Sequence, residues 1–271
     1  MNARAMLAIV RKDLKVVIQN KNIVTPIIII LVVFFIVFPW LVGQAPTIIH
    51  GLGGQTTSLE GILAKMPGGM LQEMAGYTVG QKVIVFALVY MLMPFFLMIP
   101  LMAASMLAAD SFAGEKERKT LEALLYTPTT DRELLIAKML SGWLASIAVA
   151  LVGFMIYAIN VNAAAWSQMQ RIFFPNALWL LLIIWVVPAL SGLGVSLMVV
   201  VSARAQGFQD ANQMAGLVVL PIVALFYAQV AGAIFINTGL LLLMGLIVWL
   251  MTGVLIWLGS RSFRRNRLLA A

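Results

Sequence analysis

Residues that can make ionic contacts gather in one stretch of this chain. Positions 110–138 carry 11 of its 28 Asp, Glu, Lys and Arg residues. Within that stretch, Leu121, Leu124 and Leu125 recur at the i, i+3, i+4 spacing of one helix face, and charged residues crowd the other faces. The pattern predicts a short amphipathic helix whose chemistry is ionic and apolar contact with another surface.

A turn and a second helix are expected to follow. Pro128 cannot continue a helix because its ring removes a backbone donor. Thr130, with Glu133 three residues later, has the form of a capping box, which starts a new helix. The stretch is therefore predicted to be helix, turn, helix.

Residues for bond-making chemistry are missing from the sequence. It has no cysteine, which excludes thiolate nucleophiles and thiolate metal sites, and its single histidine, His50, cannot build a zinc site. No segment matches the phosphate-binding pattern G-x-x-x-x-G-K-[ST]; the nearest lysine after a glycine, Lys82, comes after Gly80 and Gln81 and is followed by Val83. We expect no catalytic residue, bound cofactor or metal on this chain.

The composition is that of an integral membrane protein. Of the 271 residues, 62% are hydrophobic and only 10% are charged, which excludes an ordinary soluble surface. The net charge of +8 comes from cations that flank apolar segments, where anionic lipid and membrane topology explain them better than nucleic acid does. We expect one all-α membrane domain that binds no nucleic acid.

Six transmembrane helices are predicted, because about 20 apolar residues cross the roughly 30 Å of hydrocarbon in a bilayer. The turn at Asn237, Thr238 and Gly239 is the weakest division, since the segments beside it could instead form a re-entrant hairpin. The predicted spans are 23–43, 83–109, 139–160, 175–202, 215–236 and 239–259.

The remaining segments complete the predicted domain organisation. Residues 1–22 are expected to form an interfacial amphipathic helix, or more simply a charged N-terminus that fixes topology. Residues 23–259 are expected to form the six-span transmembrane domain, with a charged loop at 110–138 and an outer loop at 44–82, and 260–271 a basic tail. The apolar face of the N-terminal helix is expected to contain Met6, Leu7, Val10, Leu14, Val17 and Ile18, and its basic face Arg4, Arg11, Lys12 and Lys15.

The distribution of lysine and arginine predicts the orientation. With the N-terminus inside, fifteen of these residues lie in cytoplasmic segments and three, Lys65, Lys82 and Arg171, lie outside. The positive-inside rule then places both termini and the 110–138 loop in the cytoplasm. The expected location is the cell membrane, or the inner membrane of a cell that has two.

No Asp, Glu, Lys, Arg or His lies inside the predicted spans. A proton-driven carrier usually needs an ionisable group there, so this absence argues against a secondary carrier. A membrane path without an energy source of its own indicates that a partner supplies the energy through the charged loop.

The run EKERKTLEALLYTPTTDRELLIAK, residues 115–138, resembles the cytoplasmic loop of type-2 ATP-binding-cassette (ABC) transporter permeases. Lys119 departs from the family pattern, which often has glycine there. Weaker similarities lie at Lys12, Asp13 and Leu14 and in SARAQGFQDANQMAG, residues 202–216. The matching positions are Glu117, Arg118, Thr120, Leu121, Glu122, Leu124, Leu125, Pro128, Ala137 and Lys138.

This resemblance implies a six-helix half-transporter that pairs with itself or with a sister permease. It also implies two separate ATPase subunits, which bind the ATP and magnesium, and a coupling helix at 120–126 that docks on them. Most relatives are exporters, so export is expected. The implied coupling residues are Glu115, Glu117, Arg118, Thr120, Leu121, Glu122, Leu124, Leu125 and Pro128, with Arg204 and Asp210 in a second cytoplasmic loop.

Three alternatives remain open at this point. The charged residues of the loop could simply form a solvated face. The chain could be an ATP-independent carrier or channel, which would transport by itself in liposomes. It could also be a membrane scaffold or sensor subunit, which would bind a partner and move nothing.

Overall fold

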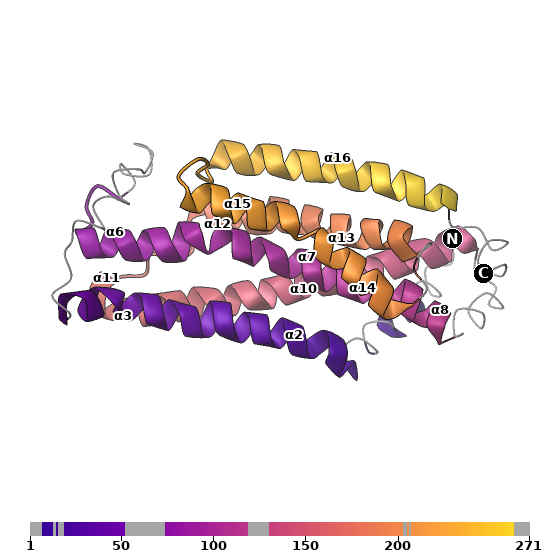
Figure 1. Cartoon of the computed structure of the whole chain (residues 1–271), viewed down its shortest axis with the longest axis horizontal. Coiled ribbons are helices and arrows are strands. Elements are labelled where there is room, and N and C mark those ends of the chain that lie inside the picture. Colours follow the sequence, from indigo (N-terminus) through magenta and orange to yellow (C-terminus); the bar gives the residue numbers. More distant parts are fainter. Residues whose placement is uncertain are drawn as a thin grey trace.

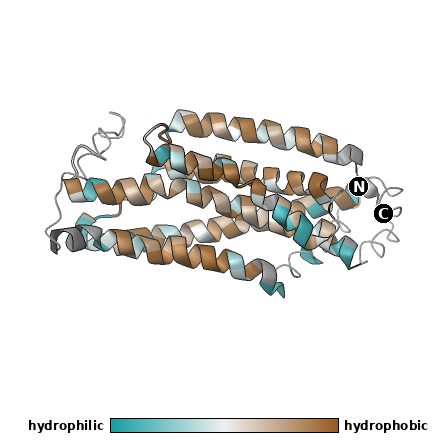
Figure 2. Ribbon diagram, viewed as in Figure 1, coloured by the Kyte–Doolittle hydropathy of each residue, from teal (hydrophilic) through white to brown (hydrophobic). Residues whose placement is uncertain are grey.

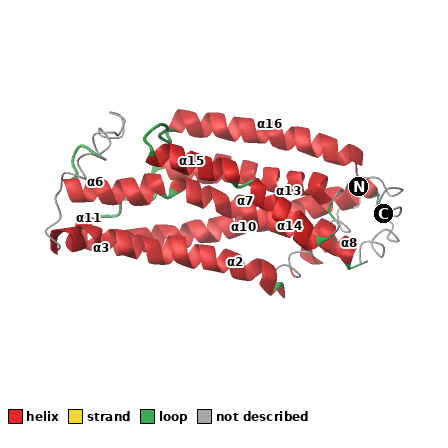
Figure 3. Ribbon diagram, viewed as in Figure 1, coloured by secondary structure: helices red, strands yellow, loops and turns green. Residues whose placement is uncertain are grey.

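The computed structural model describes residues 7–12, 15, 19–51, 74–118, 130–202, 205 and 207–262. Throughout these ranges the chain forms helices joined by turns, without a strand (Figure 3). The predicted all-α class is therefore confirmed for the described part of the chain.

Five helical segments in the described ranges are long and apolar enough to cross a membrane. They correspond to the first four predicted spans and the last one. The segments are Val24–Gln44, Val79–Gly114, Glu133–Ala164, Ala177–Ser202 and Thr238–Gly259.

The predicted fifth span, 215–236, is not one continuous helix. The structure has α14 (Phe208–Leu217) and α15 (Leu220–Val230) there, separated by a turn at Val218 and Val219. Helix α15 has 11 residues, a length of about 16 Å at 1.5 Å per residue, which is about half of the hydrocarbon thickness. Six full spans are therefore not confirmed, and the re-entrant hairpin stays a prediction.

Figure 1 shows how α14 and α15 nevertheless preserve the layout of the bundle. Together they carry the chain back from the end where α8 lies, and α16 (Thr238–Ser262) then returns to that end. The connection between α15 and α16 lies short of the far ends of α3 (Phe38–Gly51) and α6 (Val79–Val85).

Helix α7 (Met93–Ala109) is the centre of the bundle, and nearly all its side chains are buried. It packs against α10 (Asp131–Ala164) and α13 (Val187–Ser202). A Cβ at Gly194 would lie 2.8 Å from the Cβ of Ala104. Small residues thus let α7 and α13 approach closely, which is how helices associate in lipid.

Four short π-helical segments interrupt three of the long helices in the described ranges, because η2 and η3 lie in the same one. Pro94 lies in α7, just after η2, and has no N–H to donate to the carbonyl of Tyr90 in η2, four residues earlier. That oxygen therefore needs another donor. The π-helical segments are η1 (Val33–Val37) between α2 (Lys21–Val32) and α3, η2 (Phe86–Met91) between α6 and α7, η3 (Asp110–Gly114) between α7 and α8 (Glu115–Glu117), and η4 (Leu182–Val186) between α12 (Ala177–Leu181) and α13.

An aromatic cluster fills the core of the bundle away from α8. Trp179 is fully buried, and its ring centroid lies 4.9 Å from that of Phe174, 5.1 Å from Phe96 and 5.2 Å from Tyr157. The cluster joins α7, α10, α12 and the turn between α11 (Trp166–Met169) and α12.

Polar residues are concentrated at the other end of the bundle. In Figure 2 the long helices are mostly brown, whereas α8 and α14 carry the conspicuous teal segments. The charged residues singled out by the sequence therefore flank one end of an otherwise apolar bundle.

Candidate functional site

Glu115 forms the centre of a buried charged network at the α8 end of the bundle. It is the first residue of α8 and is only 6% exposed. Its carboxylate accepts hydrogen bonds from Lys138 Nζ at 2.5 Å and from Lys12 Nζ at 2.7 Å. The two ion pairs join three separate segments, namely the helical residues 7–12, α8 and α10.

Lys138 is fully buried in the apolar segment of α10, where an unpaired ammonium group would be very costly. Besides Glu115, its Nζ donates to the backbone oxygen of Ser111 at 2.7 Å and to its Oγ at 3.1 Å. It also lies 5.6 Å from the centroid of the Phe112 ring, within cation–π range. These contacts explain how α10 tolerates a buried lysine that the sequence analysis had placed in the loop.

The network determines the ionisation of Glu115. Burial by itself would raise the pKa of the carboxyl group, but the nearby ammonium groups of Lys138 and Lys12 outweigh it and hold the pKa below its ordinary value. Glu115 is therefore a carboxylate at neutral pH, and the three-segment junction is ionic.

Arg118 anchors the end of α8 on the preceding π-helical segment. Its Nη1 donates to Asp110 Oδ1 at 3.0 Å, and Asp110 is only 4% exposed. A Cβ at Gly114 would lie 2.9 Å from the same Asp110 oxygen, so the backbone passes close to this ion pair. The pair fixes η3 and α8 relative to each other.

Glu117 connects α8 to α14. Its Oε2 accepts a hydrogen bond of 2.9 Å from the backbone N–H of Phe208, the first residue of α14. A carboxylate at this position interacts favourably with the unpaired N–H groups and the positive end of the helix dipole. A Cβ at Gly207 would lie 2.6 Å from the same oxygen, so glycine permits this close approach.

The predicted capping box is confirmed at the start of α10. Thr130 Oγ1 accepts from the backbone N–H of Glu133 at 3.3 Å, and the N–H of Thr130 donates to Glu133 Oε2 at 3.0 Å. Glu133 is 8% exposed. The junction between the charged stretch and α10 is thus well defined.

The structure brings three of the predicted coupling residues, Glu115, Glu117 and Arg118, into these contacts. Asp210 lies in the first turn of α14, the helix to which Glu117 is bonded. The coupling helix itself, like the full N-terminal amphipathic helix, stays a prediction. The predicted residues outside the described ranges are Thr120, Leu121, Glu122, Leu124, Leu125, Pro128 and Arg204.

The motifs of the sequence do not reveal the partners of these side chains. Lys12 and Lys138 both belong to such motifs, but nothing in the motifs pairs them with Glu115. A lysine beside Ala137 and Met139 on an apolar helix does signal a buried counter-charge. The contact between Glu117 and a backbone N–H 91 positions away has no such signal.

No group of three His, Cys, Asp or Glu side chains that could hold a metal ion occurs within the described ranges. The geometry of this site is that of a mechanical junction between helices, formed by ion pairs and capping contacts.

Comparison with known proteins gives a match to a protein family. The family model described as "ABC-2 family transporter protein" matches residues 7–242. This range includes every described residue of the charged junction, which consists of Glu115, Glu117 and Arg118 with their partners Lys12, Asp110, Lys138 and Phe208. No curated protein matches the chain.

Proposed function

The chain belongs to the ABC-2 family of transporter proteins, and we propose that it is one half of an exporter driven by separate ATPase subunits. Its family and its apolar helices identify it as a multi-pass membrane protein and a permease subunit. The proposal adds the direction of transport, the ATPase partner and the surface that contacts it.

The observation that carries the proposal is that the described residues on both sides of positions 119–129 are bonded to the bundle. On one side, Arg118 is bonded to Asp110, and on the other, Thr130 and Glu133 cap α10. A force applied to a segment held in this way passes into the bundle.

Three helices would receive that force. The Arg118–Asp110 pair leads to η3 and α7, and the Thr130 cap leads to α10. The Glu117 contact leads to α14, and through it to α15. The Glu115–Lys138 pair holds α8 and α10 together, so these elements would move as a unit.

In the proposed mechanism, the nucleotide is bound and hydrolysed on the partner subunits, and this chain supplies only contacts. Leu121, Leu124 and Leu125 would bury against the ATPase, and Glu122 would fix its orientation. Closure of two ATPase subunits would then push on two copies of the charged junction, one in each permease half. The lysine and arginine distribution supports a cytoplasmic position for the junction.

The test is co-purification of the chain with a co-expressed ABC ATPase subunit encoded beside it. We expect Leu121→Asp to abolish co-purification and ATP-dependent transport, because it puts a charge into an apolar contact. Ala123→Asp is the matched control, since position 123 lies on a different helix face. If the folded Leu121→Asp protein binds the ATPase and transports normally, the proposed contact surface is wrong.

The orientation can be tested independently, because the natural chain contains no cysteine. A single cysteine introduced at position 123 should react with a membrane-impermeant maleimide only after the cells are opened. Labelling in intact cells would place the stretch outside and contradict the proposal. Transport by the chain in liposomes without any ATPase would instead favour an independent carrier.

A further inference from the structure

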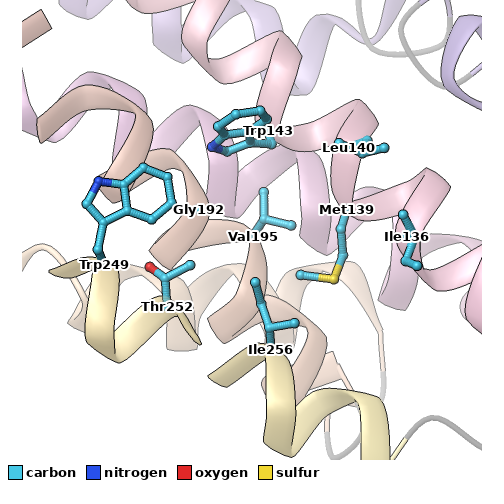
Figure 4. Close-up of a pocket in the computed structure, with 9 residues that line it drawn as sticks. All are labelled: Ile136, Met139, Leu140, Trp143, Gly192, Val195, Trp249, Thr252 and Ile256. Carbon is cyan, nitrogen blue, oxygen red and sulfur yellow. The ribbon is translucent and has the colours of Figure 1, made fainter. Parts of the chain in front are cut away.

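An apolar cavity lies between three helices, and one of its lining residues, Met139, directly follows Lys138 of the charged network along α10. It has a volume of about 280 Å³ and is lined by side chains of α10, α13 and α16 (Figure 4). The side chains that carry the argument are Met139 and Trp143 of α10, Val195 of α13, and Trp249, Thr252 and Ile256 of α16.

The polar atoms of the lining residues are turned away from the cavity or occupied. Trp143 Nε1 donates to the backbone oxygen of Pro188 at 2.8 Å, and Thr252 Oγ1 donates to that of Ala189 at 3.3 Å. The Trp249 nitrogen is buried and lies on the side of its ring away from the other labelled side chains in Figure 4. The walls therefore present carbon, which favours an alkyl group over water or a polar solute.

The surroundings of the cavity determine which alkyl group reaches it. Both α10 and α16 contribute membrane-spanning segments, and the lining side chains Ile136 and Ile256 are themselves 39% and 42% exposed. In a bilayer these side chains face hydrocarbon. The cavity is thus open to lipid chains, without any polar barrier between them and its walls.

The size fits one hydrocarbon chain. The volume of about 280 Å³ is nearly twice that of the ~150 Å³ apolar cavities that stay dry and bind benzene. The cavity extends from Ile136 to Trp143 along α10, which is about 10 Å at 1.5 Å per residue. A narrow recess of this length suits a run of methylene groups better than a folded protein segment.

We propose that this cavity binds one acyl chain of a phospholipid. The lipid would come from the leaflet beside the charged junction, because Ile136 lies close to the start of α10 and Ile256 close to the end of α16. The bound chain would fill the space between α10 and α16 and support both against α13. The site does not depend on the direction of transport or on an ATPase partner.

The test uses the full chain in phosphatidylcholine vesicles that contain a phospholipid with a diazirine on one acyl chain. After illumination, mass spectrometry locates the labelled residues. We expect severalfold more label on Met139 and Ile256 than on Leu250 and Val254, which are exposed on α16 outside the cavity. Equal labelling of the two sets would overturn the proposal. So would the absence of label on Met139 and Ile256, which is the result expected if a second copy or another segment of the chain covers the cavity.

A pair of variants sharpens the result. Ile256→Trp should fill the cavity and reduce labelling of Met139 severalfold, whereas Val254→Trp, on another face of the same helix, should leave it unchanged. Unchanged labelling of Met139 in a folded Ile256→Trp protein would contradict the proposal. The wild-type pattern remains decisive if that variant fails to fold.

Discussion

The two ends of the bundle are held together in different ways. At the α8 end, Glu115 and Glu117 make a few directional contacts that join segments distant in sequence, and Arg118 bonds to Asp110, eight residues earlier. In the other half, Trp179 and its aromatic neighbours pack in a continuous cluster. The first kind of contact depends on single atoms, while the second is spread over whole rings.

Backbone carbonyls of η2 make further contacts between helices in the aromatic half. Three successive carbonyls of η2, those of Leu88, Val89 and Tyr90, accept hydrogen bonds from side chains of other helices. The donors are the hydroxyl of Tyr157, the indole of Trp179 at 2.8 Å and the amide of Gln229 at 2.9 Å. Within lipid such bonds replace those that a π-helical segment and a proline remove.

This difference suggests a division of work. The aromatic packing energy is shared among many ring contacts, so the cluster resists small displacements and stabilises the bundle. At the α8 end, contacts of exposed side chains, such as that of Glu117 with α14, can be broken and remade by a partner at a modest cost. We therefore expect stability to depend most on the aromatic half, and coupling to depend most on the charged junction.

The largest loss of stability is expected from Trp179→Ala. This change removes a fully buried ring and leaves the carbonyl of Val89 without its donor. Large-to-small changes of this kind cost about 3–5 kcal/mol. Thermal unfolding in detergent measures the loss, and Leu180→Ala, at an exposed neighbour, is the control. Equal effects of the two changes would contradict the structural role of the cluster.

Glu115→Ala should lower the stability of the folded chain somewhat less than Trp179→Ala does. It leaves Lys138 buried without its carboxylate, and breaking a buried pair costs about 3–5 kcal/mol. The two bonds from Lys138 to Ser111 remain and should keep the loss near the lower limit. Glu117→Ala is the matched control, because its carboxylate is exposed and its loss should lower the melting temperature less.

A second change can separate charge burial from packing at this junction. Adding Lys138→Met to Glu115→Ala removes the unpaired charge, so the double variant should recover part of the lost stability. If the double variant is less stable than Glu115→Ala alone, the charge of Lys138 is not the cause of the loss.

Gln229→Leu should have a smaller effect. The change removes the donor to the carbonyl of Tyr90 and nearly preserves side-chain volume. Interhelical hydrogen bonds in membranes average about 0.6 kcal/mol, with a maximum near 1.7. A thermal shift assay in detergent should show a small decrease. A loss of thermal stability as large as that of Trp179→Ala would contradict this expectation, and it would mean that the contact between α15 and η2 is essential to the stability of the bundle.

The smallest expected effect is that of mild acid. The pKa of Glu115 is lowered in the folded chain, so its contribution is present above the ordinary value of 4.5 and is lost as the pH falls through the folded value. The difference in melting temperature between the wild type and Glu115→Gln should be constant near neutral pH and should shrink below pH 4.5. A difference that shrinks only above neutral pH would contradict the assignment.

Local sequence patterns predicted the parts of the fold that depend on local chemistry. Apolar runs identified five spanning segments, and Thr130 and Glu133 identified the start of α10. The fifth predicted span was not confirmed, because hydropathy alone did not register the turn at Val218 and Val219 or the end of α15 at Val230. A window of apolar residues measures composition and not helical continuity.

By itself, the sequence determined that this chain is a helical membrane protein with one charged stretch, and that this stretch resembles a permease loop. The first follows from composition and spacing over a few turns, and the second from the match of individual residues to the pattern of the family. Only the tertiary structure decided that Glu115 pairs with Lys12 and Lys138, that Glu117 contacts α14, and that three helices enclose an apolar cavity. Those contacts join residues up to 103 positions apart, and no local pattern encodes them, because they depend on which helix faces meet when the bundle packs.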